Sequence, residues 1–300
     1  MPITIATWNI NSVRLRQGLV LDLLKAESPD ILCLQEAKSP VEKMPAQVFA
    51  EAGYPHMVAR GQKGYNGVII LSRLPLEDAG HRTFCEKDEA RHVAARLENG
   101  MTIHNFYVPA GGDEANVDTN PKFAHKLGFL REMTAWFQSE PPEKSVLVGD
   151  LNIAPREDDV WSHKQLLKVV SHTPIEVEHL SEVQASAGWV DVTRADIAAG
   201  PLYSWWSYRS KDWSNADKGR RLDHVWATPD IAGSAHSSRI LRDVRGWTQP
   251  SSNALSMMAH SMDLMVTAGS VIPSTQALSQ GAGQMRPVNS GKLLVRTSRW

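Results

Sequence analysis

The sequence has few cysteines, little net charge and no long apolar run. Cys33 and Cys85 are the only two cysteines in 300 residues, so a disulfide framework is excluded and a reducing cytoplasm is the expected setting. No apolar run approaches the roughly 20 residues of a membrane span, and no basic segment precedes the first strand pattern. Neither a membrane protein nor a secretory signal is therefore expected. The net charge is −1, so a polyanionic partner would have to be held by a local patch or a metal ion.

The remaining composition is that of a globular protein rich in tryptophan. Apolar residues make up 42% and charged residues 22%, which excludes collagenous, coiled-coil and wholly disordered chains. The length of 300 residues leaves one large domain and two domains both open. Five of the ten tryptophans lie between Trp189 and Trp226. Such a cluster either forms core or lines a pocket for flat or unstacked groups.

Strand patterns alternate with helical patterns over most of the chain. Leucines at helical spacing predict a helix over 13–26, and Pro121 in a first turn predicts another over 122–137. Adjacent strands together with strand–helix alternation favour α/β or α+β layering. From Met265 to Trp300 the chain is rich in Ser, Gly, Thr and Gln and has no acidic residue, which predicts a flexible low-complexity tail after a domain over 1–264. Strands are predicted over 4–9, 30–35, 67–71, 92–97, 101–108, 145–149, 203–208, 222–227 and 239–244.

Polar residues gather at the ends of these predicted strands. In layered α/β folds, catalytic groups often lie at the strand ends, because the rigid strands direct their side chains into one cleft. Carboxylates with nearby amides suit Mg²⁺, which keeps several waters and takes one or two carboxylates together with substrate phosphate. Asp150 and Asp223 would then share base and support roles around a phosphoryl group. The candidate residues are Asn9, Asn11, Gln35, Glu36, Tyr107, Asp150, Asn152 and Asp223.

Each candidate also has a plain structural interpretation. The asparagines suit turns, Glu36 suits a solvated strand end, and Asp223 beside Arg220 and Arg221 suits a structural ion pair. Their joint pattern favours a catalytic site, because all of them lie at strand ends. No zinc spacing, phosphate-binding loop or dinucleotide fingerprint competes with this interpretation.

Six motifs occur in order along the chain: TWNINS (7–12), LQEAK (34–38), GYNGV (64–68), NFYVP (105–109), GDLNIAP (149–155) and RLDH (221–224). By these motifs, residues 1–250 resemble the exonuclease III family of abasic-site (AP) endonucleases, within the endonuclease/exonuclease/phosphatase superfamily. The resemblance implies an α/β fold, a four-layered αββα sandwich of two mixed sheets flanked by helices, with the site where the strand ends of both sheets meet. It also implies Mg²⁺-dependent hydrolysis, with Mn²⁺ as a substitute, of double-stranded DNA at abasic sites or 3′ ends. A cytoplasmic monomer is expected.

The resemblance assigns a role to several residues. Glu36 resembles the principal Mg²⁺ ligand, with Asn9 beside it. Asp150 resembles the residue that activates the attacking water. Asn152 resembles the residue that orients this water and stabilises the transition state, and Asp150 and Asn152 are also expected at the metal. Tyr107 resembles the active-site tyrosine near the phosphate.

The resemblance extends to the DNA contacts. Asp223 resembles the residue that supports the catalytic histidine. The segment 203–208 resembles the aromatic element near the abasic pocket, although a packed strand accounts equally well for its two tryptophans. Basic residues of the same region would contact the DNA backbone: Arg209, Lys211, Lys218, Arg220 and Arg221. The residues predicted to bind DNA most directly are Trp205, Trp206, Arg209, Arg221 and Asn253.

The C-terminal end departs from the family pattern. Family members carry a Ser-Asp-His-Ala-Pro run shortly after an Arg-Gly-Trp-like segment, whereas the segment 245–247 is followed here by Ser-Ser-Asn-Ala-Leu over 251–255. Ser252 takes the aspartate position and Asn253 the histidine position. Asparagine donates a hydrogen bond but has neither a positive charge nor a titratable proton. His260 is no substitute, because seven residues of extended strand would carry it roughly 20 Å away.

Two functional interpretations follow from this departure. The first is a Mg²⁺-dependent DNA-repair phosphodiesterase that the loss of the histidine has impaired. The second is an inactive remnant that binds abasic DNA. A superfamily hydrolase acting on lipid or inositol phosphoesters is a distant third, against which the motifs over 107–109 and 149–155 speak. A blurred last strand is predicted over 257–264, and either a shifted reading frame or divergence would explain the changed ending.

Overall fold

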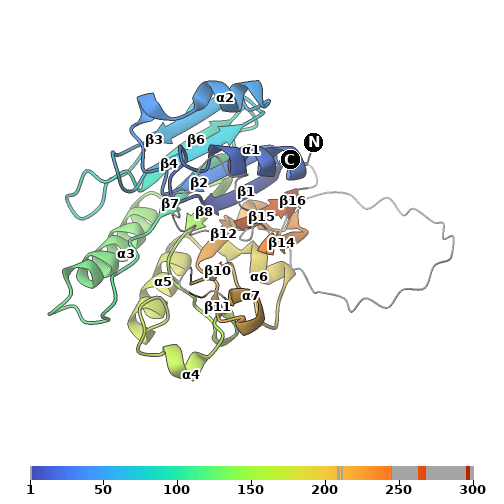
Figure 1. The fold of residues 1–300 in the computed structure, drawn as a ribbon. Helices are drawn as coiled ribbons and strands as arrows, with labels where there is room; N and C mark the ends of the chain where they lie inside the picture. The colour runs from blue at the N-terminus through green and yellow to red at the C-terminus, as the bar shows by residue number, and fades with distance from the viewer. Residues whose placement is uncertain are drawn as a thin grey trace, which may run out of the picture.

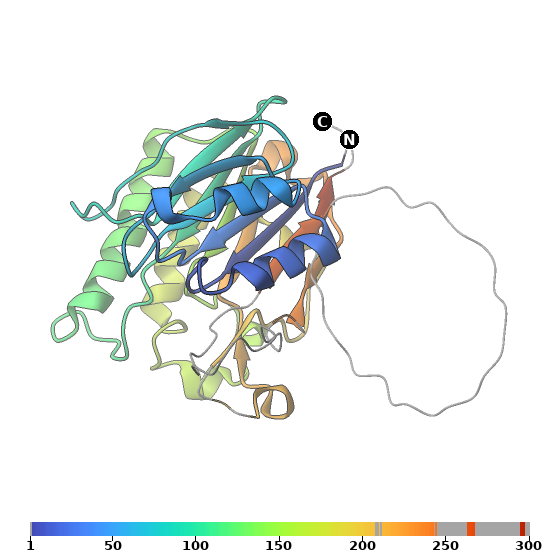
Figure 2. The same ribbon diagram turned by 45° about the horizontal axis from the view of Figure 1, so that its top comes forward.

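Two β-sheets lie face to face, and each is covered by helices on its outer side (Figure 1, Figure 2). The computed structural model describes residues 2–207, 210, 212–242 and 244, together with the backbone of residues 263–267 and 295–297. The larger sheet is formed by β1 (Thr4–Asn9), β2 (Ile31–Gln35), β3 (His56–Arg60), β4 (Val68–Ser72), β13 (Ala235–His236), β14 (Ser238–Ile240), β15 (Asp263–Thr267) and β16 (Val295–Thr297). The smaller sheet is formed by β5 (Leu76–Asp78), β6 (His92–Leu97), β7 (Thr102–Tyr107), β8 (Ser145–Asp150), β9 (Val190–Asp191) and β12 (Asp223–Ala227).

Both sheets are mixed. In the larger sheet β1 and β2 are parallel, whereas β4 runs antiparallel to β2. In the smaller sheet β7 and β8 are parallel, whereas β12 runs antiparallel to β8. A separate two-stranded ribbon pairs β10 (Trp205–Trp206) with β11 (Gly219–Arg220).

Helices form the two outer layers. The inner strands are apolar on both faces because one face meets the other sheet and the opposite face meets helices. In β8, for example, Val146 and Val148 pack between the sheets, while Leu147 packs under the helices of the smaller sheet. The larger sheet is covered by α1 (Gln17–Glu27) and α2 (Ala46–Glu51), and the smaller sheet by α3 (Pro121–Ser139) and α5 (Pro174–Ser186). The short helices are η1 (Val41–Lys43), η2 (Glu157–Asp159), α4 (His163–Leu166), α6 (Val192–Asp196), α7 (Trp213–Ala216) and α8 (Pro229–Ala232).

The helices over the smaller sheet begin at clear sequence signals. The side chain of Asn120 accepts a hydrogen bond from the backbone of Lys122, and Pro121 occupies the first turn of α3. At α5, Thr173 and Glu176 form a capping box around Pro174. The capping box was a sequence signal for α5, which the strand and helix predictions omitted.

The observed layers confirm the predicted sandwich, with corrections at several boundaries. Helix α1 begins at Gln17, not at residue 13, and β10 is only two residues long within the segment 203–208. Strand β15 pairs antiparallel with β1 and extends past Leu264, and the division into a domain over 1–264 and a tail over 265–300 stays a prediction. The rest of the predicted tail, apart from β16, lies outside the described residues. Within the described residues, no helix combines the length and the apolar character that a membrane crossing requires.

Candidate active site

Strand pairing brings the predicted polar residues to one edge of the sandwich. Asn9 and Gln35 are opposite one another at the ends of β1 and β2, so Glu36 follows directly beside Asn9. In the other sheet, Asp150 is paired with Tyr107 on one side and with Asp223 on the other. Directly paired residues share a face of a sheet, so the three side chains point the same way, toward the larger sheet.

Unusual backbone conformations aim the side chains that follow these strands. Glu36 and Asn152 both have left-handed backbones, with φ of 52° and 55°. The turn at Glu36 is held by backbone hydrogen bonds from the next two residues to the loop that ends at Gly67. A side chain at Gly149 would clash with the carbonyl oxygen of Phe106, which explains the glycine before Asp150.

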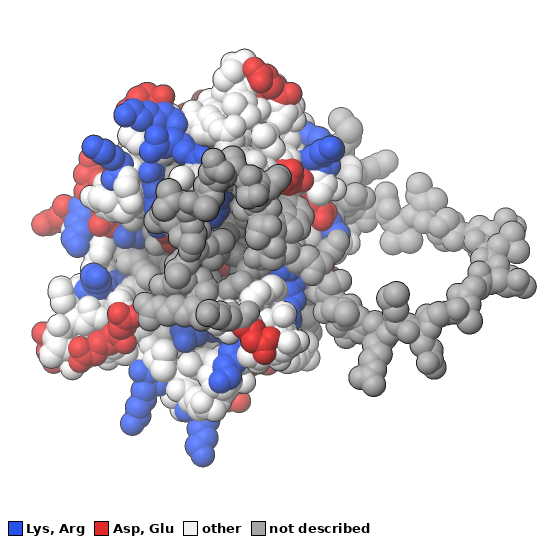
Figure 3. All heavy atoms as spheres, viewed as in Figure 1, with Lys and Arg blue, Asp and Glu red and all other residues white. Residues whose placement is uncertain are grey.

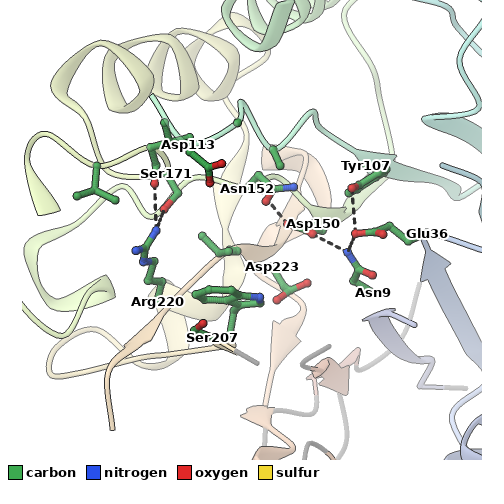
Figure 4. A pocket seen from close by; sticks show the side chains of 16 residues that line it. Asn9, Glu36, Tyr107, Asp113, Asp150, Asn152, Ser171, Ser207, Arg220 and Asp223 are labelled. Carbon is green, nitrogen blue, oxygen red and sulfur yellow. Dashed lines mark hydrogen bonds between the residues drawn. The ribbon is translucent and has the colours of Figure 1, made fainter. Parts of the chain in front are cut away.

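A single amide links the two carboxylates. The Nδ2 group of Asn9 donates to Glu36 Oε1 and to Asp150 Oδ2, both at 2.8 Å (Figure 4). The Tyr107 hydroxyl donates to the same Oε1 of Glu36 at 2.9 Å, and the ammonium of Lys38 lies 2.7 Å from Glu36 Oε2. The two carboxylates, one from each sheet, are therefore held at the same point of the pocket.

The two carboxyl groups have pKa values shifted in opposite directions. Burial raises the pKa of Asp150 to about 7, although the hydrogen bond from Asn9 acts in the opposite direction. Burial also acts to raise the pKa of Glu36, but the charge of Lys38 and the hydrogen bonds from Lys38, Asn9 and Tyr107 together lower it. Glu36 is thus ionised at neutral pH, while Asp150 exchanges a proton near neutrality.

Asn152 and Asp223 are both fixed by their surroundings. The backbone N–H of Asn152 donates to Asp150 Oδ1 at 3.0 Å, and its side-chain amide donates to the carbonyl oxygen of Val108 at 2.9 Å. The hydroxyl of Ser204 donates to Asp223 Oδ2 at 2.6 Å. Ser204 was not predicted from the sequence, because no motif distinguishes one serine in an aromatic segment.

These residues line a pocket of about 490 Å³. One side of the pocket is formed by Asn9, Glu36, Tyr107, Asp150 and Asn152. Figure 4 shows Arg220 and Ser171 on the opposite side. The other described residues of the lining are Ala110, Gly112, Asp113, Val169, Val170, Trp205, Ser207, Leu222 and Asp223.

Two of the residues predicted to bind DNA are buried and have protein partners. Arg221 is fully buried, and its guanidinium forms ion pairs with Asp159 and Asp191 at 2.9 and 2.8 Å. Trp206 is buried, and its indole N–H donates to Asp217. Their DNA contacts stay predictions, and the sequence alone did not show that these two side chains lie in the interior while their neighbours Arg220 and Trp205 line the pocket.

The other predicted DNA contacts have different outcomes. Trp205 lines the pocket, whereas Arg209 and Asn253 lie outside the described residues, as do Ser252 and Lys211. Lys218 is exposed and lies over the ring of Trp161. Figure 3 shows Lys and Arg mixed with Asp and Glu among the described residues of the face in view, in keeping with the small net charge.

The donor set fits a hard divalent cation. Oxygen atoms of Glu36 and Asp150 lie around the Asn9 side-chain nitrogen and the Asn152 backbone N–H, and Mg²⁺ takes one or two carboxylates while it keeps waters. Among the described residues, no three His, Cys, Asp or Glu side chains gather as a metal cluster, so the fit rests on this carboxylate pair. Lys38 occupies one oxygen of Glu36 and would have to share that oxygen with a cation.

Known proteins resemble the chain along most of its length. The endonuclease/exonuclease/phosphatase family model matches residues 6–252. The chain is 27% identical to exodeoxyribonuclease III of Haemophilus influenzae, over 83% of this chain and 96% of that protein. It is 30% identical to the DNA repair nuclease APEX1 of Danio rerio, over 81% of this chain and 78% of that protein. The chain belongs to the exonuclease III family of AP endonucleases.

Solved structures of this family share the fold. An AP endonuclease from Archaeoglobus fulgidus matches with a TM-score of 0.77 and 30% identity, over 89% of this chain and 99% of that chain. A 3′ phosphatase from Neisseria, bound to a product DNA hairpin, matches with a TM-score of 0.78 and 28% identity, over the same shares of the two chains. The exonuclease III fold predicted from the sequence motifs is therefore confirmed.

Proposed function

We propose that this chain is a Mg²⁺-dependent DNA-repair phosphodiesterase that cleaves double-stranded DNA at abasic sites and removes nucleotides or blocking groups from 3′ ends. The observation that carries the proposal is the Asn9 amide, which joins Glu36 of one sheet to Asp150 of the other at the pocket wall. Family membership supports the reaction class. The DNA-bound relative supports the substrate, since that protein has the same fold.

The residues have distinct roles in the proposed reaction. Asp150 accepts a proton from the attacking water, because its carboxylate is held at the pocket wall by the Asn9 amide and the backbone N–H of Asn152. Asn152 orients this water and the phosphate, and the Tyr107 hydroxyl contacts the phosphate from its place beside Glu36. Glu36 and Asn9, with oxygens of Asp150 and Asn152, would hold Mg²⁺ or Mn²⁺. Such a cation polarises a phosphoryl oxygen and stabilises developing negative charge.

The leaving-group side of the site is the proposed point of impairment. Asp223 is kept in place by Ser204, but the family histidine that such an aspartate supports is replaced by Asn253 in the sequence. The family match ends at residue 252, immediately before this position. Because asparagine has no positive charge to place on the phosphate, we propose a rate well below that of a complete site. The cytoplasmic location and the monomeric state expected from the sequence stay predictions.

The proposal is tested by nicking of a duplex that carries one abasic site in the presence of Mg²⁺. Three proteins are compared: the native chain, Asp150→Asn, and the double variant Ser252→Asp/Asn253→His. Cleavage by the native chain that Asp150→Asn abolishes and the double variant accelerates is the expected result. Cleavage by the double variant alone would favour the inactive abasic-DNA-binding remnant. No cleavage by any of the three would contradict the proposed function.

A further inference from the structure

One arginine lines the pocket on the side away from the carboxylates. Arg220 belongs to β11, where it is paired with Trp205 of β10, and its Cζ lies 5.5 Å from the centre of the Trp205 ring. Its Nη1 group donates to the carbonyl oxygen of Val170 at 3.0 Å and to the hydroxyl of Ser171 at 2.7 Å. Of the described residues that line the pocket, Arg220 alone is a lysine or arginine.

The guanidinium of Arg220 is only partly used by the protein. Within the described part of the chain, Arg220 forms no ion pair with a carboxylate, and its Nε and Nη2 groups make no hydrogen bond. The neighbouring Arg221, in contrast, is buried with two aspartates. Burial lowers the pKa of Arg220, which reflects the unfavourable partial removal of this charge from water. The pocket therefore presents a fixed, partly desolvated donor group whose Nε and Nη2 have no acceptor among the described residues.

The walls beside Arg220 are mostly apolar. Val169, Val170, Leu222 and the Trp205 ring line the pocket with it. Apolar walls pack against the carbon atoms of a deoxyribose, and a guanidinium supplies donors for oxygen. An abasic sugar carries an oxygen at C1′ where an intact nucleotide carries its base. A neutral hydroxyl or aldehyde also suits these walls better than a phosphate, which would lose its hydration on several sides.

We propose that Arg220 is a specificity-determining residue that donates hydrogen bonds from Nε and Nη2 to the C1′ oxygen of an abasic deoxyribose. The inference rests on the proposed function, because it assumes that the sugar enters the pocket beside the carboxylates. The hydrogen bonds from Nη1 to Val170 and Ser171 hold the guanidinium in place. Because the guanidinium is planar and rigid, these bonds also fix the positions of Nε and Nη2.

The experiment measures binding, so that it does not depend on turnover. Fluorescence anisotropy in Ca²⁺ gives the dissociation constants of two duplexes, of which only one carries a C1′ hydroxyl. One contains a borohydride-reduced abasic site, which keeps a C1′ hydroxyl, and the other contains a tetrahydrofuran residue, which lacks it. The reduced sugar is also an open chain, so the preference of the native chain is compared with that of each variant. The proteins are the native chain, Arg220→Met, Arg220→Lys and the control Lys218→Met, which removes an exposed cation of the same segment.

The native chain is expected to prefer the reduced site, and Arg220→Met is expected to lose this preference. A hydrogen bond from a charged donor corresponds to roughly tenfold or more in affinity. Arg220→Met should therefore bind the duplex with the reduced site more weakly by that factor, while its affinity for the tetrahydrofuran duplex changes little. Arg220→Lys should restore part of the preference. Lys218→Met removes a predicted contact with the DNA backbone, so it should change the affinity for both duplexes equally and leave the preference between them unchanged. Equal weakening of both duplexes by Arg220→Met, or no weakening, would overturn the inference. Failure of the proposed function would show separately, as no Mg²⁺-dependent product from the native chain despite selective binding.

Discussion

A buried lysine behind the active site provides a quantitative test of how the pocket is built. Lys126 of α3 is fully buried, and its ammonium lies 2.5 Å from the equally buried carboxylate of Glu176. The same ammonium donates to the backbone carbonyl oxygen of Asn152 at 2.8 Å. Glu176 in turn accepts hydrogen bonds from the backbone of Ser171, which lines the pocket. The ion pair thus connects the catalytic turn to the opposite wall of the pocket.

Replacing Lys126 with methionine is expected to destabilise the protein by about 3 kcal/mol. Removal of one partner of a buried ion pair typically costs about 3–5 kcal/mol, because a buried charge loses its compensation. The lower end applies here because the carboxylate of Glu176 keeps donors from Ser171 and from the backbone and hydroxyl of Thr173. Urea unfolding of Lys126→Met and of the native chain measures the difference.

Two further variants make this prediction refutable. Lys122→Met removes an exposed lysine from the same helix and is expected to change the free energy of unfolding by less than about 0.5 kcal/mol. Lys126→Met/Glu176→Gln removes both charges and is expected to recover part of the loss. A cost for Lys126→Met no larger than that of Lys122→Met would refute the reasoning.

Three other outcomes are expected. In the metal-free protein, folding raises the pKa of Asp150 from its ordinary value of 3.8 to about 7. The protonated carboxyl group therefore stabilises the fold at a pH below 3.8, and this stability is lost as the pH rises through about 7. Asp150→Asn should raise the melting temperature at pH 8 but not at pH 4. A scan in chelator that showed the opposite trend would contradict this sign. Lys38→Met should lower the Mg²⁺ concentration needed for half-maximal binding severalfold in calorimetry, because the ammonium competes for Glu36, and unchanged binding would count against that competition. Arg221→Met should destabilise the chain by about 3–5 kcal/mol in urea, whereas a surface DNA contact would cost less than about 0.5 kcal/mol.

The sequence predicted the residues of the carboxylate side because strand ends carry them. The strand β1 was predicted with both of its observed ends, and the polar residue at its end, Asn9, joins Glu36 and Asp150 as the strand-end pattern implied. Strand pairing converts sequence positions into neighbours, so the gathering of side chains from distant segments follows once the strands are placed.

The sequence could not predict which neighbouring side chain faces the pocket. Arg220 and Arg221 are adjacent and chemically identical, yet one lines the pocket and the other is buried with two aspartates. The same difference separates Trp205 from Trp206. Trp205 and Trp206 form a two-residue strand, and Arg221 directly follows another, so the local pattern is too short to show which side chain faces the pocket. The role of Lys126 was hidden for a related reason, since a lysine in a helix is usually exposed.

The rate of abasic-site cleavage as a function of Mg²⁺ concentration tests the central claim most directly. Single-turnover rates of the native chain and of Glu36→Gln would be compared on a duplex with one abasic site, with a chelator-treated sample as reference. A phosphodiesterase built on the joined Glu36 and Asp150 carboxylates should give a native rate that rises with Mg²⁺ and saturates, and Glu36→Gln should need far more Mg²⁺ or show no product. Equal cleavage with and without Mg²⁺, or an unchanged Mg²⁺ dependence in Glu36→Gln, would contradict the claim.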